Sequence, residues 1–225
     1  MDGPYETIYP MTAQARSAAR VETSDASELV VRGPDLTLRY ARPSDAPRLF
    51  ELASDPDVTN YFSWGPYTSQ SQAADYIANL GPKRADGSRL EFVVDHRAAC
   101  VIGVTGLSEF SLRDRRAVVG TWLGRDWWGT GANRQSKKLV LALAFAGLQL
   151  GRVTAWCGAD NGRSQRALER LGFVHEGVLR AWHVHHGEPK DVISYSMLRN
   201  EWEQGELARE PFEIAGRIPA QFLTT

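Results

Sequence analysis

The chain has 225 residues, a hydrophobic content of 43% and a formal net charge of −1 at pH 7. This length suits one domain with additional terminal segments, and the apolar content is sufficient for a substantial core. The balanced charge argues against nucleic-acid binding through overall electrostatic attraction. Because no apolar run reaches the length of a membrane span and the N-terminus has no apolar signal core, we expect a cytoplasmic protein.

Residues 1–34 are mostly small and polar, which is typical of a segment that buries little surface. We expect this N-terminal extension to be either mobile or packed against a partner subunit. The second alternative rests on a small apolar cluster formed by Tyr5, Ile8, Tyr9 and Met11. The patterned part of the chain follows this extension.

The rest of the chain alternates between strand-like and helix-like patterns. Period-two alternation and β-rich apolar runs predict strands at residues 36–40, 90–95, 100–110, 117–123, 152–157, 173–180 and 191–198. Helical spacing of apolar residues predicts helices at residues 42–52, 69–80, 132–148 and 161–171. Cys100 and Cys157 fall in apolar strand-like runs, so we expect two buried reduced thiols. Residues 204–225 show no such pattern, and we expect a loosely packed C-terminal tail there.

A glycine-bearing turn joins the strand at residues 117–123 to the following helix. Gly129, Thr130 and Gly131 remove bulky side chains where the chain must turn, and the helix starts near Ala132. The bare amides of a helix N-terminus carry a partial positive charge, so they favour a phosphate or pyrophosphate. The same glycines would also suit a tight turn that binds no ligand. This motif alone therefore does not establish a phosphate site, and a second motif is needed to support it.

A second motif follows the strand at residues 152–157. Asn161 is expected to cap a helix that carries Ser164 in its first turn. Gly172 ends this helix, as a C-terminal glycine commonly does. The order from residue 117 onward is thus strand, glycine-bearing turn, helix, strand, asparagine-led helix and strand.

This arrangement resembles the GNAT superfamily of acyl-CoA-dependent N-acyltransferases. Within it, the chain is most similar to the Rim-type branch, which includes ribosomal-protein N-terminal acetyltransferases and small-molecule resistance enzymes. The matching segments are residues 127–133, 161–173 and 176–180. The resemblance implies an α+β (α/β/α) GNAT fold, in which a mixed central sheet of about seven strands has helices on both faces and a V-shaped cleft between the fourth and fifth strands. It places the acyltransferase domain at residues 35–203.

The resemblance implies that acetyl-CoA is the co-substrate. His175, His183, His185 and His186 are scattered over a strand and a connector without a helical i, i+4 pair or a cysteine partner, so we expect no metal. In the family, a bulge in the strand before the glycine turn presents a backbone amide to the thioester carbonyl, which here would lie at Trp122 and Leu123. The pantetheine arm would lie alongside like an added strand, and the amides of the turn would hold the pyrophosphate. The expected cofactor contacts are Trp122, Leu123, Trp128, Gly129, Thr130, Gly131, Ala132, Asn133, Asn161 and Ser164.

The resemblance also assigns candidate catalytic residues. Many family members use a tyrosine to protonate the leaving thiolate, but Leu168 holds that place here, and Ser164 is the expected thiolate partner. A glutamate that is common in related sequences is replaced by Val118. The candidate general bases are therefore Glu109, as the best remaining carboxylate, and His183, as the best imidazole. A water chain that carries the proton is the alternative to both.

The acceptor implied by the resemblance is a primary amine, either of a small molecule or at a protein N-terminus. Aromatic residues of the loop at residues 55–67 are expected to line the acceptor pocket, namely Tyr61, Phe62, Trp64 and Tyr67. Their density favours a small or aromatic-bearing acceptor. The family resemblance is also compatible with a homodimer.

Two other functions remain open. Basic residues flank the expected cofactor segments and would allow the same fold to take an aminoacyl group from a tRNA; they are Arg134, Lys137, Lys138, Arg163 and Arg166. A solvated basic helix face is the simpler interpretation of the same residues. The missing tyrosine and glutamate would also suit a degenerate acyl-CoA-binding or interaction domain.

Overall fold

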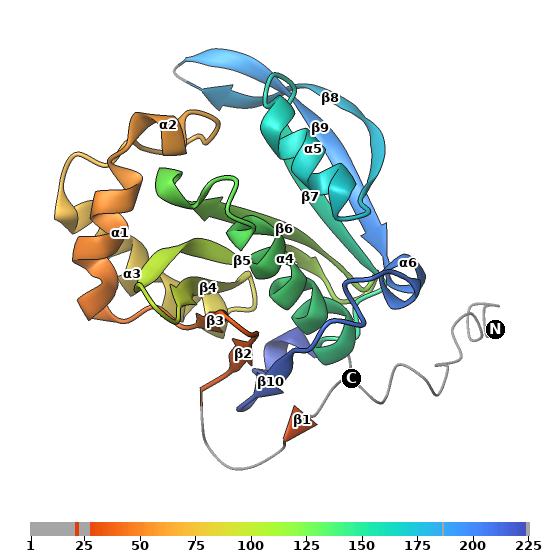
Figure 1. Ribbon diagram of the computed structural model, residues 1–225. Helices are drawn as coiled ribbons and strands as arrows, with labels where there is room; N and C mark the ends of the chain where they lie inside the picture. The colour runs from red at the N-terminus through yellow and green to blue at the C-terminus, as the bar shows by residue number, and fades with distance from the viewer. Residues whose placement is uncertain (1–20, 23–27, 186, 224–225) are drawn as a thin grey trace.

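A computed structural model describes residues 21–22, 28–185 and 187–223, and Figure 1 shows its fold. The described strands form one mixed sheet of ten strands in the order β1-β10-β2-β3-β4-β5-β6-β7-β9-β8. They are β1 (Val21–Glu22), β2 (Val30–Arg32), β3 (Leu36–Arg39), β4 (Arg89–His96), β5 (Val101–Ser111), β6 (Arg116–Leu123), β7 (Arg152–Gly158), β8 (Val174–His185), β9 (Glu188–Leu198) and β10 (Glu213–Ala215). The expected α+β class is confirmed. Most of the expected N-terminal extension, at residues 1–20 and 23–27, lies outside the described residues.

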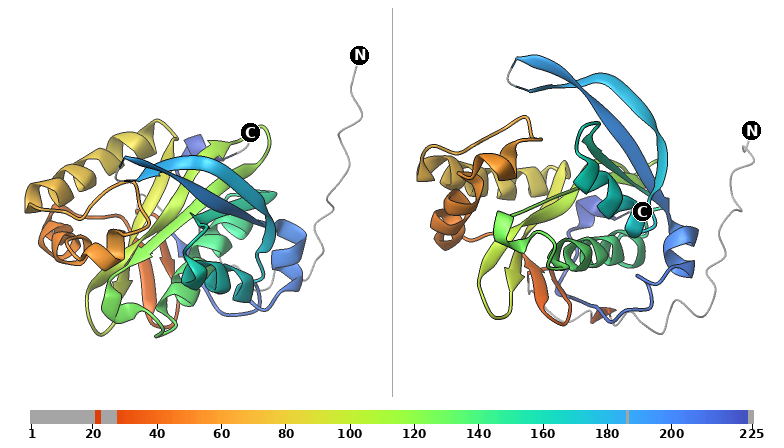
Figure 2. Two further views of the ribbon diagram at one scale, coloured as in Figure 1. Left: turned by 90° about the horizontal axis from the view of Figure 1, so that it is seen from above. Right: turned by 45° about the horizontal axis from the view of Figure 1, so that its top comes forward.

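Helices cover both faces of this sheet, as Figure 2 shows. They are α1 (Ala46–Ala53), α2 (Pro56–Thr59), α3 (Gln70–Ala85), α4 (Ala132–Ala142), α5 (Gly162–Arg170) and α6 (Arg199–Gln204), and α4 continues as a π-helical turn at Leu143–Gly147. On one face α1 and α3 pack against β5 and β4, and on the other α4 packs against β3, β5 and β6. None of the helices in the described ranges is long and apolar enough to cross a membrane.

Strand β4 shows why the central strands are apolar at consecutive positions. Leu90, Phe92 and Val94 belong to the large core that includes α4. Val93 points to the opposite face and packs with residues of α1 and α3. Successive side chains of a strand point to opposite faces, so a strand that is covered on both faces must be apolar throughout. This burial on both faces accounts for the strong strand signal in this part of the sequence.

The central parallel strands β6 and β7 pair over only part of their length. Their ladder runs from Arg116↔Arg152 to Val119↔Ala155. Beyond it, β6 continues to pair with β5, and β7 continues to pair with β9. The sheet therefore opens between the strands that were expected to be fourth and fifth in the chain, as the resemblance implied.

The two ends of the domain differ from the expectation. Leu29 and Val31 are fully buried, so the packed structure begins before residue 35. The expected loose packing of residues 204–225 is wrong for their described part, because β10 pairs with β2 and Phe222 is fully buried. Both β2 and β10 have three residues, which is too short to show a recognisable period in the sequence.

The last hairpin is longer than predicted. Strands β8 and β9 extend through the expected polar connector to a turn at Gly187, so His183 and His185 lie in a strand. Most side chains in this part of the hairpin are exposed, and its signal in the sequence was the short alternation of Trp182 and Val184 with His183 and His185. Cys100 also differs from the expectation, because it is exposed where the chain turns into β5.

Candidate active site

The glycine turn after β6 is held in shape by its own side chains. The indole N–H of Trp128 donates to the carbonyl oxygen of Leu123 at 2.9 Å. The hydroxyl of Thr130 donates to the carbonyl three residues earlier at 2.9 Å and accepts from the amide of Ala132 at 3.3 Å. The turn is therefore ordered without the amides of residues 129–131, which donate no hydrogen bond within the described part of the chain.

Two glycines give this turn an open surface. Gly129 and Gly131 have φ angles of 77° and 92°, in the left-handed region that glycine adopts without strain. A Cβ atom at either position would meet nothing within 4 Å, so the turn faces open space. Gly131 is also the N-cap of α4 and offers no side chain to the amides of the first turn. Available amides at a helix N-terminus, beside open space, suit a phosphate or pyrophosphate.

The first turn of α5 contacts the glycine turn. The guanidinium of Arg163 lies 3.4 Å from the ring centroid of Trp128, which is a cation–π contact between the two motifs. Asn161 caps α5, because its side-chain oxygen accepts from the amide of Ser164 at 3.1 Å. Burial raises the pKa of the Cys157 thiol on β7 to about 11, and the Ser164 side chain partly offsets this rise. The structure therefore brings the expected cofactor residues of both motifs together.

The edge of β6 differs from the expected geometry. Its pairing with β5 is unbroken from Gly103↔Leu123 to Ser108↔Val118, so the bulge expected at Trp122 and Leu123 is absent. The edge of β6 that faces β7 is instead unpaired from the point where their ladder ends. Backbone groups on such an edge can bind an extended chain as an added strand. The backbone amide that would bind the thioester carbonyl of the acyl donor would therefore belong to a regular strand edge. This edge is accessible because β7 no longer pairs with β6 there.

Aromatic side chains of the loop between α2 and α3 gather beside β6. The ring centroid of Trp64 lies 5.2 Å from that of Phe62 and 5.5 Å from that of Tyr67. It also lies 5.5 Å from the ring centroid of Trp122. Tyr61 is not part of these ring contacts and is 38% exposed. Three of the four predicted acceptor residues therefore form one aromatic cluster, and Trp64 joins this cluster to Trp122 on the strand that borders the opening.

A carboxylate that the sequence analysis missed lies on the same face of the sheet. Glu91 pairs with Gly106 of β5, and Gly106 pairs with Gly120 of β6. A Cβ atom at Gly106 would lie 2.8 Å from the Cγ of Glu91, so the Glu91 side chain lies against this glycine. A Cβ atom at Gly120 would meet nothing within 4 Å. The two glycines therefore leave space between the Glu91 carboxylate and the unpaired edge of β6.

Two neighbours hold the Glu91 carboxylate. It accepts hydrogen bonds from the Tyr76 hydroxyl at 2.9 Å and from the Arg89 guanidinium at 3.1 Å, and its side chain is 15% exposed. Beyond the last pair of the β6–β7 ladder, the next residues are Gly120 on β6 and Trp156 on β7. Both positions lie on the same face of the sheet as Glu91. In the sequence, Glu91 is a single charged residue inside an apolar strand. The strand register that places it opposite two glycines cannot be seen in the sequence alone.

The two predicted bases lie at different distances from the opening between β6 and β7. Glu109 is exposed, with a φ angle of 50°, beyond the ladder at the closed end. At about 3.3 Å per residue, it lies roughly 20 Å along β5 from Gly103, the partner of Leu123. His183 is half-buried on β8, and its ring centroid lies 6.4 Å from that of Trp156. The structure therefore places His183 near the open side and Glu109 away from it.

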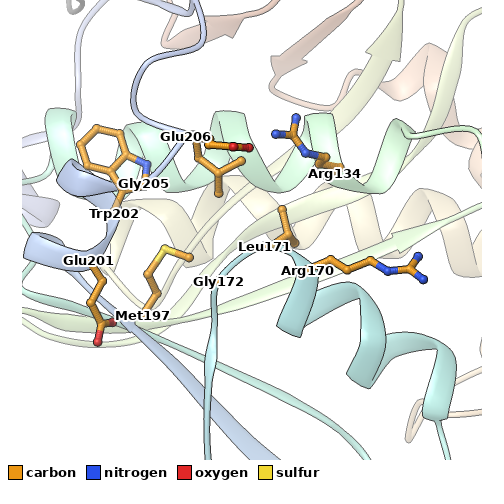
Figure 3. A pocket seen from close by; sticks show the side chains of 10 residues that line it. Arg134, Arg170, Leu171, Gly172, Met197, Glu201, Trp202, Gly205 and Glu206 are labelled. Atoms are coloured by element: carbon orange, nitrogen blue, oxygen red, sulfur yellow. The ribbon is translucent and has the colours of Figure 1, made fainter.

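A separate pocket of about 220 Å³ lies between α4, α5 and α6, as Figure 3 shows. Its lining includes Arg134 from the first turn of α4 and Arg170 from the last turn of α5. The indole N–H of Trp202, which also lines this pocket, has no hydrogen-bond partner within the described residues. The pocket lies beside the helix that begins at the glycine turn. A cavity of about 480 Å³ at the turn between β2 and β3 lies away from both motifs.

Comparison with known proteins identifies the family. A family model described as an acetyltransferase (GNAT) domain matches residues 35–174, so the chain belongs to the GNAT acetyltransferase family. The "Uncharacterized N-acetyltransferase p20" of Bacillus licheniformis is 33% identical over 168 residues, which cover 74% of this chain and 94% of that protein. The "Putative ribosomal N-acetyltransferase YdaF" of Bacillus subtilis is 27% identical over 172 residues, which cover 75% of this chain and 93% of that protein.

A solved structure confirms the fold. The microcin C7 self-immunity acetyltransferase MccE, in complex with acetyl-CoA and AMP, superposes with a TM-score of 0.68. The match covers 74% of this chain and 93% of MccE, and because the sequence identity is 22% it shows the fold alone. The predicted family, the GNAT fold and the enzyme class of an N-acetyltransferase are therefore confirmed.

Proposed function

We propose that this protein transfers an acetyl group from acetyl-CoA to a primary amine, by direct attack of the amine within a ternary complex. The observation that carries this proposal is the glycine turn at residues 129–131, whose unused amides lie at the start of α4. In a GNAT acetyltransferase, this donor set suits the pyrophosphate of the co-substrate. Acetyl-CoA supplies an acyl group that is already activated, so the main task of the protein is to bind and orient.

Each part of the co-substrate has residues of matching chemistry in the chain. The amides of residues 129–131 and of the first turn of α4 would hold the pyrophosphate. The unpaired edge of β6, up to Leu123, would hold the pantetheine arm as an added strand. Arg170 lies at the pocket between α4 and α5 and would bind a phosphate at the nucleotide end, whereas Arg134 at the same pocket is already paired with Glu210.

The acceptor amine would approach from the face that α1 and α3 cover. Trp64 and Trp122 present aromatic surface there, which attracts an ammonium group. The Glu91 carboxylate faces the edge of β6 over Gly106 and Gly120. We assign Glu91 the role of general base, which acts directly or through one water. His183 is the alternative base. The position of Glu109 at the closed end of the sheet argues against its earlier assignment.

The contacts of the basic residues favour acetyl-CoA over an aminoacyl-tRNA as the donor. Arg134 and Lys138 form ion pairs with Glu210, and Arg163 stacks on Trp128. These cations are therefore partly neutralised or held inside the protein, which weakens their attraction for a nucleic-acid backbone. A small-molecule amine and a protein N-terminus both present the group that the site would accept. The aromatic cluster supports a small acceptor, whereas the name of YdaF points to a ribosomal one.

Titration calorimetry with acetyl-CoA, and with CoA in parallel, tests the donor. We expect both ligands to bind to the purified protein, and no binding of either would contradict the proposal. Release of the CoA thiol in the presence of a panel of small amines and of short peptides with free N-termini then tests the acceptor. Binding without turnover on any of these amines would favour the degenerate acyl-CoA-binding domain.

A further inference from the structure

Strand β8 carries a bulge that a side chain of β9 holds in place. Where the register of the hairpin shifts, the three residues at 180–182 of β8 lie opposite Asp191 alone. The carboxylate of Asp191 accepts a hydrogen bond from the amide of Ala181 at 2.7 Å, and Ala181 has a φ angle of 50°. Residues other than glycine seldom adopt this angle, and bulges redirect the side chains next to them. The large side chain in this bulge is Trp182.

The bulge brings Trp182 onto the side chain of Trp156 on β7. Their ring centroids lie 5.3 Å apart at an interplanar angle of 72°, which is an edge-to-face contact. Trp156 points to the face that α1 and α3 cover, because its neighbours Ala155 and Cys157 pack in the core with α4. Trp182 remains 48% exposed. The pair therefore offers an ordered aromatic surface on the face of the sheet where Glu91 lies.

A second aromatic surface lies on the other side of the sheet opening. Trp64, in the loop between α2 and α3, contacts Trp122 on β6. The same loop reaches β7, because a Cβ atom at Gly158 would lie 3.3 Å from the ring of Tyr61. Figure 2 shows the outer part of the β8–β9 hairpin beside this loop. Between the two surfaces, a Cβ atom at Gly120 would meet nothing within 4 Å, so the opening has an aromatic wall on each side and free space between them.

The register of the sheet sets the distance between Glu91 and the second wall. Glu91, Gly106 and Gly120 are paired across β4, β5 and β6, and Trp156 is the next residue in this row on β7. Three strand spacings of about 4.8 Å separate the Cα atoms of Glu91 and Trp156 by about 14 Å or more. The Glu91 side chain lies against Gly106 and covers part of this distance. An amine held at Glu91 therefore needs a body several bonds long to reach Trp182.

We propose, resting on the proposed function, that the acceptor is a small primary amine with an aromatic ring at its far end, and that Trp182 selects it by stacking on that ring. The charge distribution sets the orientation. The carboxylate of Glu91 attracts the end that carries the amine, and the uncharged ring binds to Trp156 and Trp182. Asp191 is a positioning residue, because it acts only through the bulge that directs Trp182.

The test compares amines of similar length that differ in the ring. Release of the CoA thiol at saturating acetyl-CoA gives kcat and KM for 3-phenylpropylamine, tryptamine and hexylamine. We expect Trp182→Ala to raise KM for the two aromatic amines by about tenfold, with kcat and the KM for hexylamine nearly unchanged. Trp182→Phe keeps a ring and should restore most of the loss. Asp191→Ala should raise the same two KM values in part. Val184→Ala, on the same strand and 63% exposed, is the matched control and should leave all three unchanged.

The outcomes separate this inference from the function on which it rests. If Trp182→Ala raises KM equally for all three amines, or for none, Trp182 does not recognise the ring and the inference is overturned. Sedimentation of wild type and Trp182→Ala tests a second copy as the occupant, and loss of a dimer in the variant would also overturn the inference. If acetyl-CoA binds but wild type acetylates neither aromatic amine, the inference fails and the donor assignment survives. If acetyl-CoA does not bind, the proposed function itself fails.

Discussion

Among single residues, Lys137 couples the stability of the fold to pH. Burial gives it a pKa of about 8 in the folded protein, against an ordinary value of 10.5. Between these two values the unfolded chain binds more protons than the folded protein, so the free energy of unfolding rises with pH in this range. Below pH 8 the buried charge lowers the stability of the fold by an amount on the order of 3 kcal/mol.

Replacement of Lys137 by methionine should therefore stabilise the protein at neutral pH. We expect Lys137→Met to exceed wild type by on the order of 1 to 3 kcal/mol at pH 7, and this advantage to shrink as the pH approaches 10. Urea denaturation at the two pH values measures it. An advantage that stays constant with pH would contradict the assignment. Lys138→Met should instead be less stable than wild type at pH 7, because it leaves Glu210 without its buried partner.

Glu91 is the residue whose change should most reduce turnover. Glu91→Gln keeps the size of the side chain and an acceptor for the Tyr76 hydroxyl, but it removes the group that would take a proton from the amine. We expect kcat to fall by about 100-fold or more, with little change in the affinity for acetyl-CoA. Glu109→Gln, at the closed end of the sheet, is the matched control and should keep wild-type turnover. Equal activity of the two variants would sink the assignment.

At the scale of elements, the glycine turn should be sensitive to a single methyl group. Gly131→Ala places a side chain at a φ angle of 92°, where a non-glycine residue costs about 1 kcal/mol, and relief of this strain would turn the amides away from a bound phosphate. We expect the Kd for acetyl-CoA to rise by about tenfold or more. Calorimetry on the folded variant measures this change.

The control for this variant is another glycine of the same conformation. Gly87 has a φ angle of 77°, and a Cβ atom there would make ordinary contacts of 3.5 Å with Gln221, away from the glycine turn. Gly87→Ala should lose a similar free energy of unfolding and keep the wild-type Kd. If both variants weaken binding equally, the loss comes from general destabilisation and not from the amides of the turn.

For the whole molecule, the C-terminal segment is part of the core. Phe222 is fully buried, and its ring centroid lies 4.7 Å from that of Phe110 on β5. Phe222→Ala should reduce the free energy of unfolding by roughly 3 to 5 kcal/mol and lower Tm by about 10 °C. Leu223→Ala, next to it and 39% exposed, should cost less than about 1 kcal/mol. Equal, small effects of both changes would show that the segment packs loosely after all.

The sequence analysis succeeded for elements that carry their own pattern. The central strands are covered on both faces, and helices such as α1 and α3 are covered on one face, so the number and order of the strongly patterned elements followed from hydrophobic spacing. It failed for β2 and β10, which are too short for a period. It also failed for the outer part of the β8–β9 hairpin, where the alternation of Trp182 and Val184 with histidines is short and lies on exposed side chains. Those elements exist because neighbouring strands offer backbone partners, which is information that lies elsewhere in the chain.

The sequence by itself determined the two motifs and, through them, the family. A turn at Gly129 and Gly131 and a cap at Asn161 depend on residues a few positions apart, so their geometry is encoded locally. Only the tertiary structure decided that Glu91 faces the opening and that Lys137 is buried. Strand register and helix packing place these residues through contacts with distant parts of the chain, and no local pattern specifies which of many charged residues will be placed in this way.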